Sequence, residues 1–95
     1  MTSLPAYVSG SAIITDPIGM HARPAVKVTK LAKKFSADIQ ISGERQEKWV
    51  NAKSPSAVMK LKAANGESLL IRANGADADD AVVALAGLIN RNFEG

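Results

Sequence analysis

The side chains best suited to chemistry lie in one short segment, DPIGMHARPAVKV, which covers residues 16–28. The segment holds the only histidine of a chain that contains no cysteine. Positive surroundings disfavour protonation of an imidazole, which leaves a nitrogen lone pair available for attack at neutral pH. That nitrogen can accept a phosphoryl group and release it later, because the N–P bond is labile. In-line transfer needs positioning and charge stabilisation more than a proton relay.

The residues around His21 predict a place for an anion. Pro17 and Gly19 have turn chemistry, and a helical pattern begins at Ala22. If a helix starts there, His21 occupies or adjoins its N-cap, where backbone N–H groups have no partner within the helix and the dipole is positive. Such an end binds anions, and the planar guanidinium of Arg23 suits phosphate. Pro24 fits the first turn because it has no N–H to leave unpaired.

Plainer interpretations of the same residues stay open at this point. A lone histidine near a helix start is commonly a surface or capping residue. One histidine without cysteine offers no ligand set for a metal ion, so we expect no metal site. A basic stripe formed by Arg23, Lys27, Lys30 and Lys34 can be a solvated helix face. The position of this stripe and of His21 at one helix end favours the functional hypothesis over these plainer interpretations.

The elements that must position these residues follow from periodicity and turn signals. Stretches rich in β-branched or alternating residues predict strands over 7–15, 38–42, 48–51 and 67–73. Helical spacing or helix-capping residues predict helices over 22–35, within 53–66 and over 77–93. The order βαββαβα predicts an α+β two-layer sandwich, with a four-stranded antiparallel sheet covered on one face by three helices.

The sequence also predicts the buried faces of the first and third helices and the capping residues of the second and third. The apolar arc of the first helix contains Ala25, Val28, Leu31, Ala32 and Phe35. For the second helix, Ser54 is the expected N-cap and Pro55 the first residue, with Gly66 after the C-terminus. For the third, Asp77 is the expected N-cap. Its apolar set is Ala78, Ala81, Val82, Leu85, Leu88 and Ile89.

Length and composition bound the class of protein. The 95 residues make room for one core, so we expect a flexible tail over 1–6 and a single domain over 7–95. A net charge of +3 with 4% aromatic residues disfavours a nucleic-acid binder. The start MTSLPAYVSG lacks the pattern of a signal peptide, and no apolar run reaches spanning length. We therefore expect a cytoplasmic protein with no membrane insertion.

The segment GMHARPAVKVTKLAKKFSADIQI, residues 19–41, resembles the active-site region of the HPr family, the histidine-containing phosphocarriers of the bacterial phosphoenolpyruvate:sugar phosphotransferase system. A second segment, NAKSPSAVMKL at 51–61, is similar to that family's regulatory serine region. The resemblance implies an open-faced β-sandwich, which agrees with the element order. It also implies that His21 accepts a phosphoryl group on Nδ1 and that Ala22 and Arg23 bind the phosphate.

The resemblance also implies partners. Phosphorylated enzyme I would donate the phosphoryl group, and IIA domains of sugar permeases would receive it. The partner-binding residues implied on the two helices are Val26, Lys30, Lys33, Pro55, Ser56 and Met59. On this hypothesis the protein is a stoichiometric carrier and not a turnover enzyme. It needs no cofactor, and we expect a monomer.

One alternative function is a regulatory module that docks to regulators in nitrogen or catabolite control. Ser54 matches the serine that a dedicated kinase phosphorylates in some members of the family. The next residue is Pro55, where relatives often have a large apolar residue, and Pro55 is a good helix opener. Ser54 is therefore either only an N-cap or also a regulatory phosphorylation site.

Overall fold

The strands form one antiparallel sheet in the order β1-β4-β2-β3. The computed structural model describes residues 7–15, 22–44, 48–61 and 63–93. The expected strands are confirmed with small shifts in their ends, as β1 (Val8–Ile13), β2 (Asp38–Gly43), β3 (Val50–Asn51) and β4 (Ser68–Asn74). The strand next to β1 in the sheet is β4, so the chain's first and last strands lie side by side.

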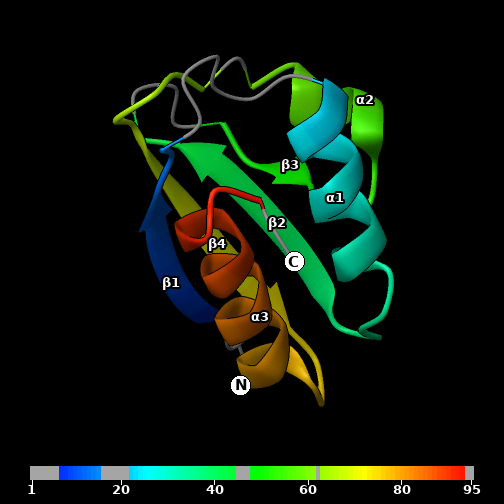
Figure 1. Ribbon diagram of the computed structural model, residues 1–95. Coiled ribbons are helices and arrows are strands. Elements are labelled where there is room, and N and C mark those ends of the chain that lie inside the picture. Colours follow the sequence, from blue (N-terminus) through cyan, green and yellow to red (C-terminus); the bar gives the residue numbers. More distant parts are fainter. Residues whose placement is uncertain (1–6, 16–21, 45–47, 62, 94–95) are drawn as a thin grey trace.

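Three helices cover one face of this sheet and leave the other face open, as Figure 1 shows. They are α1 (Ala22–Ala32), α2 (Pro55–Met59) and α3 (Ala78–Asn90). The helix α3 packs on β1 and β4, whereas α1 packs against both α2 and α3. The expected open-faced β-sandwich is confirmed. None of the helices in the described ranges is long and apolar enough to cross a membrane.

The core lies between the sheet and the helices. In the central strand β4, Leu69, Ile71 and Ala73 are buried and alternate with partly exposed residues, as a one-sided sheet requires. The apolar set expected for α3 is buried in full, so that prediction is confirmed. On α1 the expected arc is confirmed in part, because Leu31 and Phe35 are only half-buried. Burial there also includes Pro24 and Thr29.

All three helices end earlier than expected. After α1, the N–H groups of Lys34 and Phe35 donate to the carbonyls three residues back, which tightens the chain into a turn. The expectation that Gly66 follows the end of α2 is wrong. The helix stops at Met59 because the chain turns inward to bury Leu61 in the core. Gly66 belongs to a separate turn with φ of 86°.

The end of α3 is closed by a Schellman motif. Asn92 and Phe93 have φ of 56° and 60°. The N–H of Asn92 donates to the carbonyl of Ile89 at 3.1 Å, and that of Phe93 donates to Leu88 at 2.9 Å. The ammonium of Lys27, on α1, donates to the carbonyl oxygen of Phe93 at 2.6 Å. A lysine expected on a solvated stripe therefore ties α1 to the end of α3.

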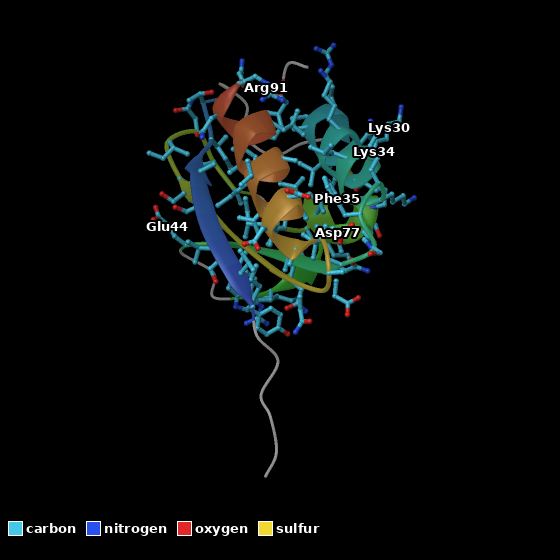
Figure 2. All side chains as sticks on the ribbon, turned by 90° about the horizontal axis from the view of Figure 1, so that it is seen from below. Lys30, Lys34, Phe35, Glu44, Asp77 and Arg91 are labelled. Carbon is cyan, nitrogen blue, oxygen red and sulfur yellow. The ribbon has the colours of Figure 1, made fainter. Side chains whose placement is uncertain are left out.

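Asp77 lies at the N-cap position of α3, as expected, but its side chain makes no capping hydrogen bond. Its carboxylate instead accepts from the backbone N–H groups of Ser36 at 2.9 Å and Ala37 at 2.8 Å. The Ser36 hydroxyl adds a bond of 3.3 Å. Figure 2 shows Asp77 beside Phe35, near the end of α1. The position of Asp77 is as expected, but the expected hydrogen bond to its own helix is wrong. Asp77 instead holds the loop between α1 and β2.

Candidate functional site

The first turn of α1 is firmly anchored. The helix begins at Ala22, as the sequence predicts, and Ala22 and Arg23 are exposed. The next two residues, Pro24 and Ala25, are buried against the core. Because they fix the direction of the helix, its N-terminal end is held in one position at the surface. His21, which directly precedes this turn, lies outside the described residues.

The electrostatics of this helix end favour an anion. The first turn of α1 contains no acidic residue. The first backbone N–H groups of a helix have no partner within it, and Pro24 contributes none. The side chain of Arg23 is exposed and has no hydrogen-bond or ion-pair partner among the described residues. Arg23 and the amides of the first turn can therefore hold a phosphoryl group that arrives at the start of α1.

The residues implied in partner binding lie on two helices that pack together. Val26 and Lys30 lie on α1, Lys33 follows it directly, and Pro55, Ser56 and Met59 lie on α2. We call these six residues the docking face. All six are exposed, including the apolar side chains of Val26 at 41% and Met59 at 40%. Exposed apolar side chains surrounded by cations suit a protein contact, although partner binding itself stays a prediction.

Ser54 forms the expected N-cap of α2. Its Oγ accepts from the N–H of Ala57 at 3.4 Å, and its backbone is extended, with φ −111° and ψ 112°. The Ser56 hydroxyl lies 3.4 Å from that of Ser54. Ser54 is partly exposed. Its capping role is confirmed, and its phosphorylation stays a prediction.

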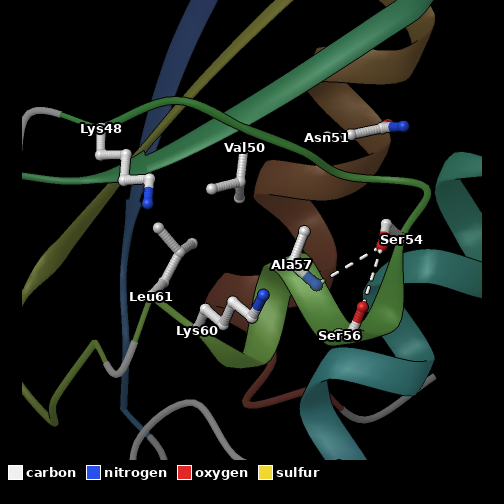
Figure 3. A pocket seen from close by; sticks show the side chains of 8 residues that line it. All are labelled: Lys48, Val50, Asn51, Ser54, Ser56, Ala57, Lys60 and Leu61. Atoms are coloured by element: carbon white, nitrogen blue, oxygen red, sulfur yellow. Dashed lines mark hydrogen bonds between the residues drawn. The ribbon is translucent and has the colours of Figure 1, made fainter.

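Beside Ser54 is a hollow of about 400 Å³ that the sequence did not reveal. Figure 3 shows Lys48 and Lys60 extending towards it from opposite sides, with Val50 and Leu61 between them. Lys60 follows α2 directly, and Lys48 precedes β3. Only the pairing of β3 against β2 and the short length of α2 bring these two lysines to one place. No spacing in the sequence signals them.

Comparisons with known proteins agree with this architecture. The sequence profile of the family described as PTS HPr component phosphorylation site matches residues 8–91. The chain is 47% identical over 75 residues to the phosphocarrier protein HPr of Mycoplasma capricolum, which covers 79% of this chain and 82% of that protein.

Solved structures show the same fold. A mycoplasma histidine-containing phosphocarrier superposes with a TM-score of 0.81 and 41% identity, over 90% of this chain and 97% of that one. Crh of Bacillus subtilis, described as a domain-swapped dimer, superposes with a TM-score of 0.70 and 30% identity, over 83% of this chain and 88% of that one. The match in sequence over most of the chain, together with the shared sheet and helix arrangement, shows that this chain belongs to the HPr family of phosphocarriers of the phosphotransferase system.

Proposed function

We propose that the protein carries a phosphoryl group on His21 between phosphorylated enzyme I and IIA domains of sugar permeases. The observation that carries this proposal is the His-Ala-Arg-Pro sequence at the start of α1, within the segment that the family profile matches. The anchored first turn, the exposed guanidinium of Arg23 and the lack of acidic residues in that turn support it.

The proposed transfer is an in-line displacement at phosphorus. The lone pair on Nδ1 of His21 attacks, the bond between phosphorus and the donor's atom breaks, and the donor keeps that electron pair. Arg23 and the amides that follow His21 neutralise the charge on the equatorial oxygens. In the second transfer the acceptor attacks, and the N–P bond to His21 breaks. The protein returns to its starting state with no net reaction of its own, so it acts as a carrier and not as a turnover enzyme.

The docking face supports successive binding of two partners by one surface. Its cations on α1 and the exposed Val26 and Met59 suit acidic partners with an apolar centre. Because one surface serves both donor and acceptor, each partner must leave before the next can bind. Such a carrier works in the cytoplasm, where the phosphotransferase components meet.

The experiment that tests this function is labelling with enzyme I and isotopically labelled phosphoenolpyruvate. We expect an acid-labile, alkali-stable phosphate on the wild-type protein and none on a His21→Ala variant. Circular dichroism controls for folding of the variant. Equal labelling of the two proteins would refute the assignment of His21.

A second prediction concerns the role of Arg23. We expect Arg23→Glu to slow phosphoryl transfer about 100-fold, because it removes a charge-assisted donor and adds an anion beside the phosphate. The matched control is Lys48→Glu, which makes the same charge change at an exposed site next to β3 and should alter the rate no more than about twofold. Rapid-quench measurement of transfer from enzyme I distinguishes them. Equal rates for the two variants would contradict the role given to Arg23.

A second candidate function is a regulatory module switched by a kinase at Ser54. The likeness to Crh, whose description refers to catabolite repression, and the partly exposed Ser54 hydroxyl favour it. His21 is present here, although a purely regulatory relative could dispense with it, which favours the carrier. A regulator that binds only the Ser54-phosphorylated protein, without any labelling of His21, would reverse the preference.

Sedimentation would test the expected monomer, since Crh and one HPr of Thermoanaerobacter tengcongensis are described as dimers.

A further inference from the structure

A groove of about 350 Å³ lies between α1 and the C-terminal end of α3, beside the docking face. Its walls carry four cationic side chains: Lys27 and Lys30 on α1, Lys34 in the turn that follows α1, and Arg91 directly after α3. Figure 2 shows Lys30 on α1, Lys34 just after it and Arg91 at the end of the neighbouring helix α3. None of the described residues that line the groove has a carboxylate. The groove is therefore a local concentration of positive charge.

One of these cations is held in place. The Lys27 ammonium donates to the Phe93 carbonyl at 2.6 Å, and the Schellman motif after α3 fixes where that carbonyl lies. An ammonium has three N–H donors, and this bond uses one. The Lys27 side chain is therefore already ordered in the groove, so it loses less conformational entropy when a ligand binds.

The spacing of the lysines suits an extended chain. Lys27 and Lys30 lie one helical turn apart on α1, and Lys34 follows them in the turn after Ala32. Alternate side chains of an extended segment point the same way about 7 Å apart, and lysines one turn apart lie at about 6 Å. Carboxylates on alternate residues can thus meet successive lysines. A single phosphate is too small to contact all three lysines from Lys27 to Lys34.

The floor of the groove is apolar and mostly buried. Leu88 is 6% exposed and Phe93 is 2% exposed, whereas Leu31 is half-buried. The cationic side chains on the walls favour an acidic occupant over an apolar helix. Lys30 belongs to both the groove and the docking face, so a protein bound to the docking face can extend into the groove without a gap.

We propose that the groove between α1 and α3 binds an extended acidic segment of a partner protein, with carboxylates on alternate residues. The segment lies along α1 and contacts Lys27, Lys30 and Lys34 in succession. This site is separate from the start of α1, so it contributes affinity and not phosphoryl-transfer chemistry. The proposal does not depend on His21 being the phosphoryl acceptor.

The test is an NMR titration of the full-length ¹⁵N-labelled protein with an acetylated, amidated peptide of alternating Glu and Gly, compared with its Gln counterpart. We expect shifts of the amides of Lys27, Leu31 and Lys34 with the Glu peptide and none with the Gln peptide. Lys34→Gln should weaken binding about threefold. The matched control Lys48→Gln, which removes the same charge outside the groove, should leave the affinity unchanged.

Three outcomes would overturn the proposal. Equal weakening by Lys34→Gln and Lys48→Gln would mean that the peptide senses only net charge. Shifts confined to the docking face would place the acidic segment elsewhere. Binding of pyrophosphate at the groove without binding of the peptide would make it a small-anion site. None of these measurements uses enzyme I or labelling of His21, so failure here is distinct from failure of the carrier function.

Discussion

A single carboxylate, that of Asp77, fixes the loop that joins α1 to β2. The hydrogen bond from the Ser36 N–H is the main cause that lowers the pKa of Asp77, and the bond from Ala37 acts in the same direction. Desolvation opposes them by favouring the neutral acid, but the net pKa stays below its ordinary value. The ionised form is thus the one that the folded loop stabilises.

This shift predicts a dependence of stability on pH. The folded-state pKa of Asp77 is lowered, so its contribution is complete above the unfolded-state pKa of about 3.9 and is lost as pH falls through the lower folded-state value. We expect Asp77→Asn to be less stable than wild type at pH 6, with the difference shrinking towards pH 2. Urea unfolding at several pH values measures it. A difference that stays constant with pH would contradict the role of the ionised carboxylate.

Residues whose partners are local in sequence could be predicted, and residues with distant partners could not. Ser54 caps the N–H of Ala57, three residues ahead, and the sequence predicts that bond. Asp77 bonds to residues about 40 positions away, and Lys27 to a carbonyl 66 positions away. Asp77 was expected to cap its own helix, and Lys27 was expected on a basic stripe. Only the packing of α1 against α3 brings these partners together.

Among the elements, helix faces were predicted better than helix ends. A periodic apolar arc is a property of the segment itself, so the buried set of α3 follows from spacing alone. Where α1 and α3 end depends on groups elsewhere in the chain. The carbonyl of Phe35, just past α1, accepts from the ammonium of Lys53 at 2.8 Å, and Lys27 caps the end of α3. Neither bond leaves a periodic signal.

The contact between β1 and α3 gives a prediction at this scale. A Cβ placed on Gly10 would lie 2.6 Å from Cγ1 of Val82, closer than real Cβ atoms approach other atoms. Valine has few rotamers to move into. We expect Gly10→Ala to lower the free energy of unfolding by about 1–3 kcal/mol, since the helix must shift away from the strand.

A double-mutant cycle with Val82→Ala checks this explanation. In the Val82→Ala background the clash is gone, so the added cost of Gly10→Ala should fall below about 0.5 kcal/mol. Chemical denaturation of the four proteins measures both terms. Additive effects would mean that Gly10 is required for a reason other than its approach to Val82.

For the whole molecule, element order was enough to predict the fold class. Four strands and three helices in the order βαββαβα allow one sheet with helices on one face, and the structure has that form. The arrangement on the open face could not be predicted. There the Arg72 guanidinium lies 4.5 Å from the ring centroid of Tyr7 and 4.1 Å from that of Trp49, and its Nε donates to Gln40 at 2.7 Å. These residues come from four separate segments that meet only in the order β1-β4-β2-β3.

The stacking of Trp49 on Arg72 gives the protein an intrinsic fluorescence probe. Trp49 is the only tryptophan, and it stacks on Arg72, which alternates with the buried residues of β4 and so lies on the side of the sheet opposite the helices. Its indole emission therefore reports whether the strands remain assembled and changes little when a ligand binds on the helical side. Unfolding can thus be followed in the presence of such a ligand without attaching a dye.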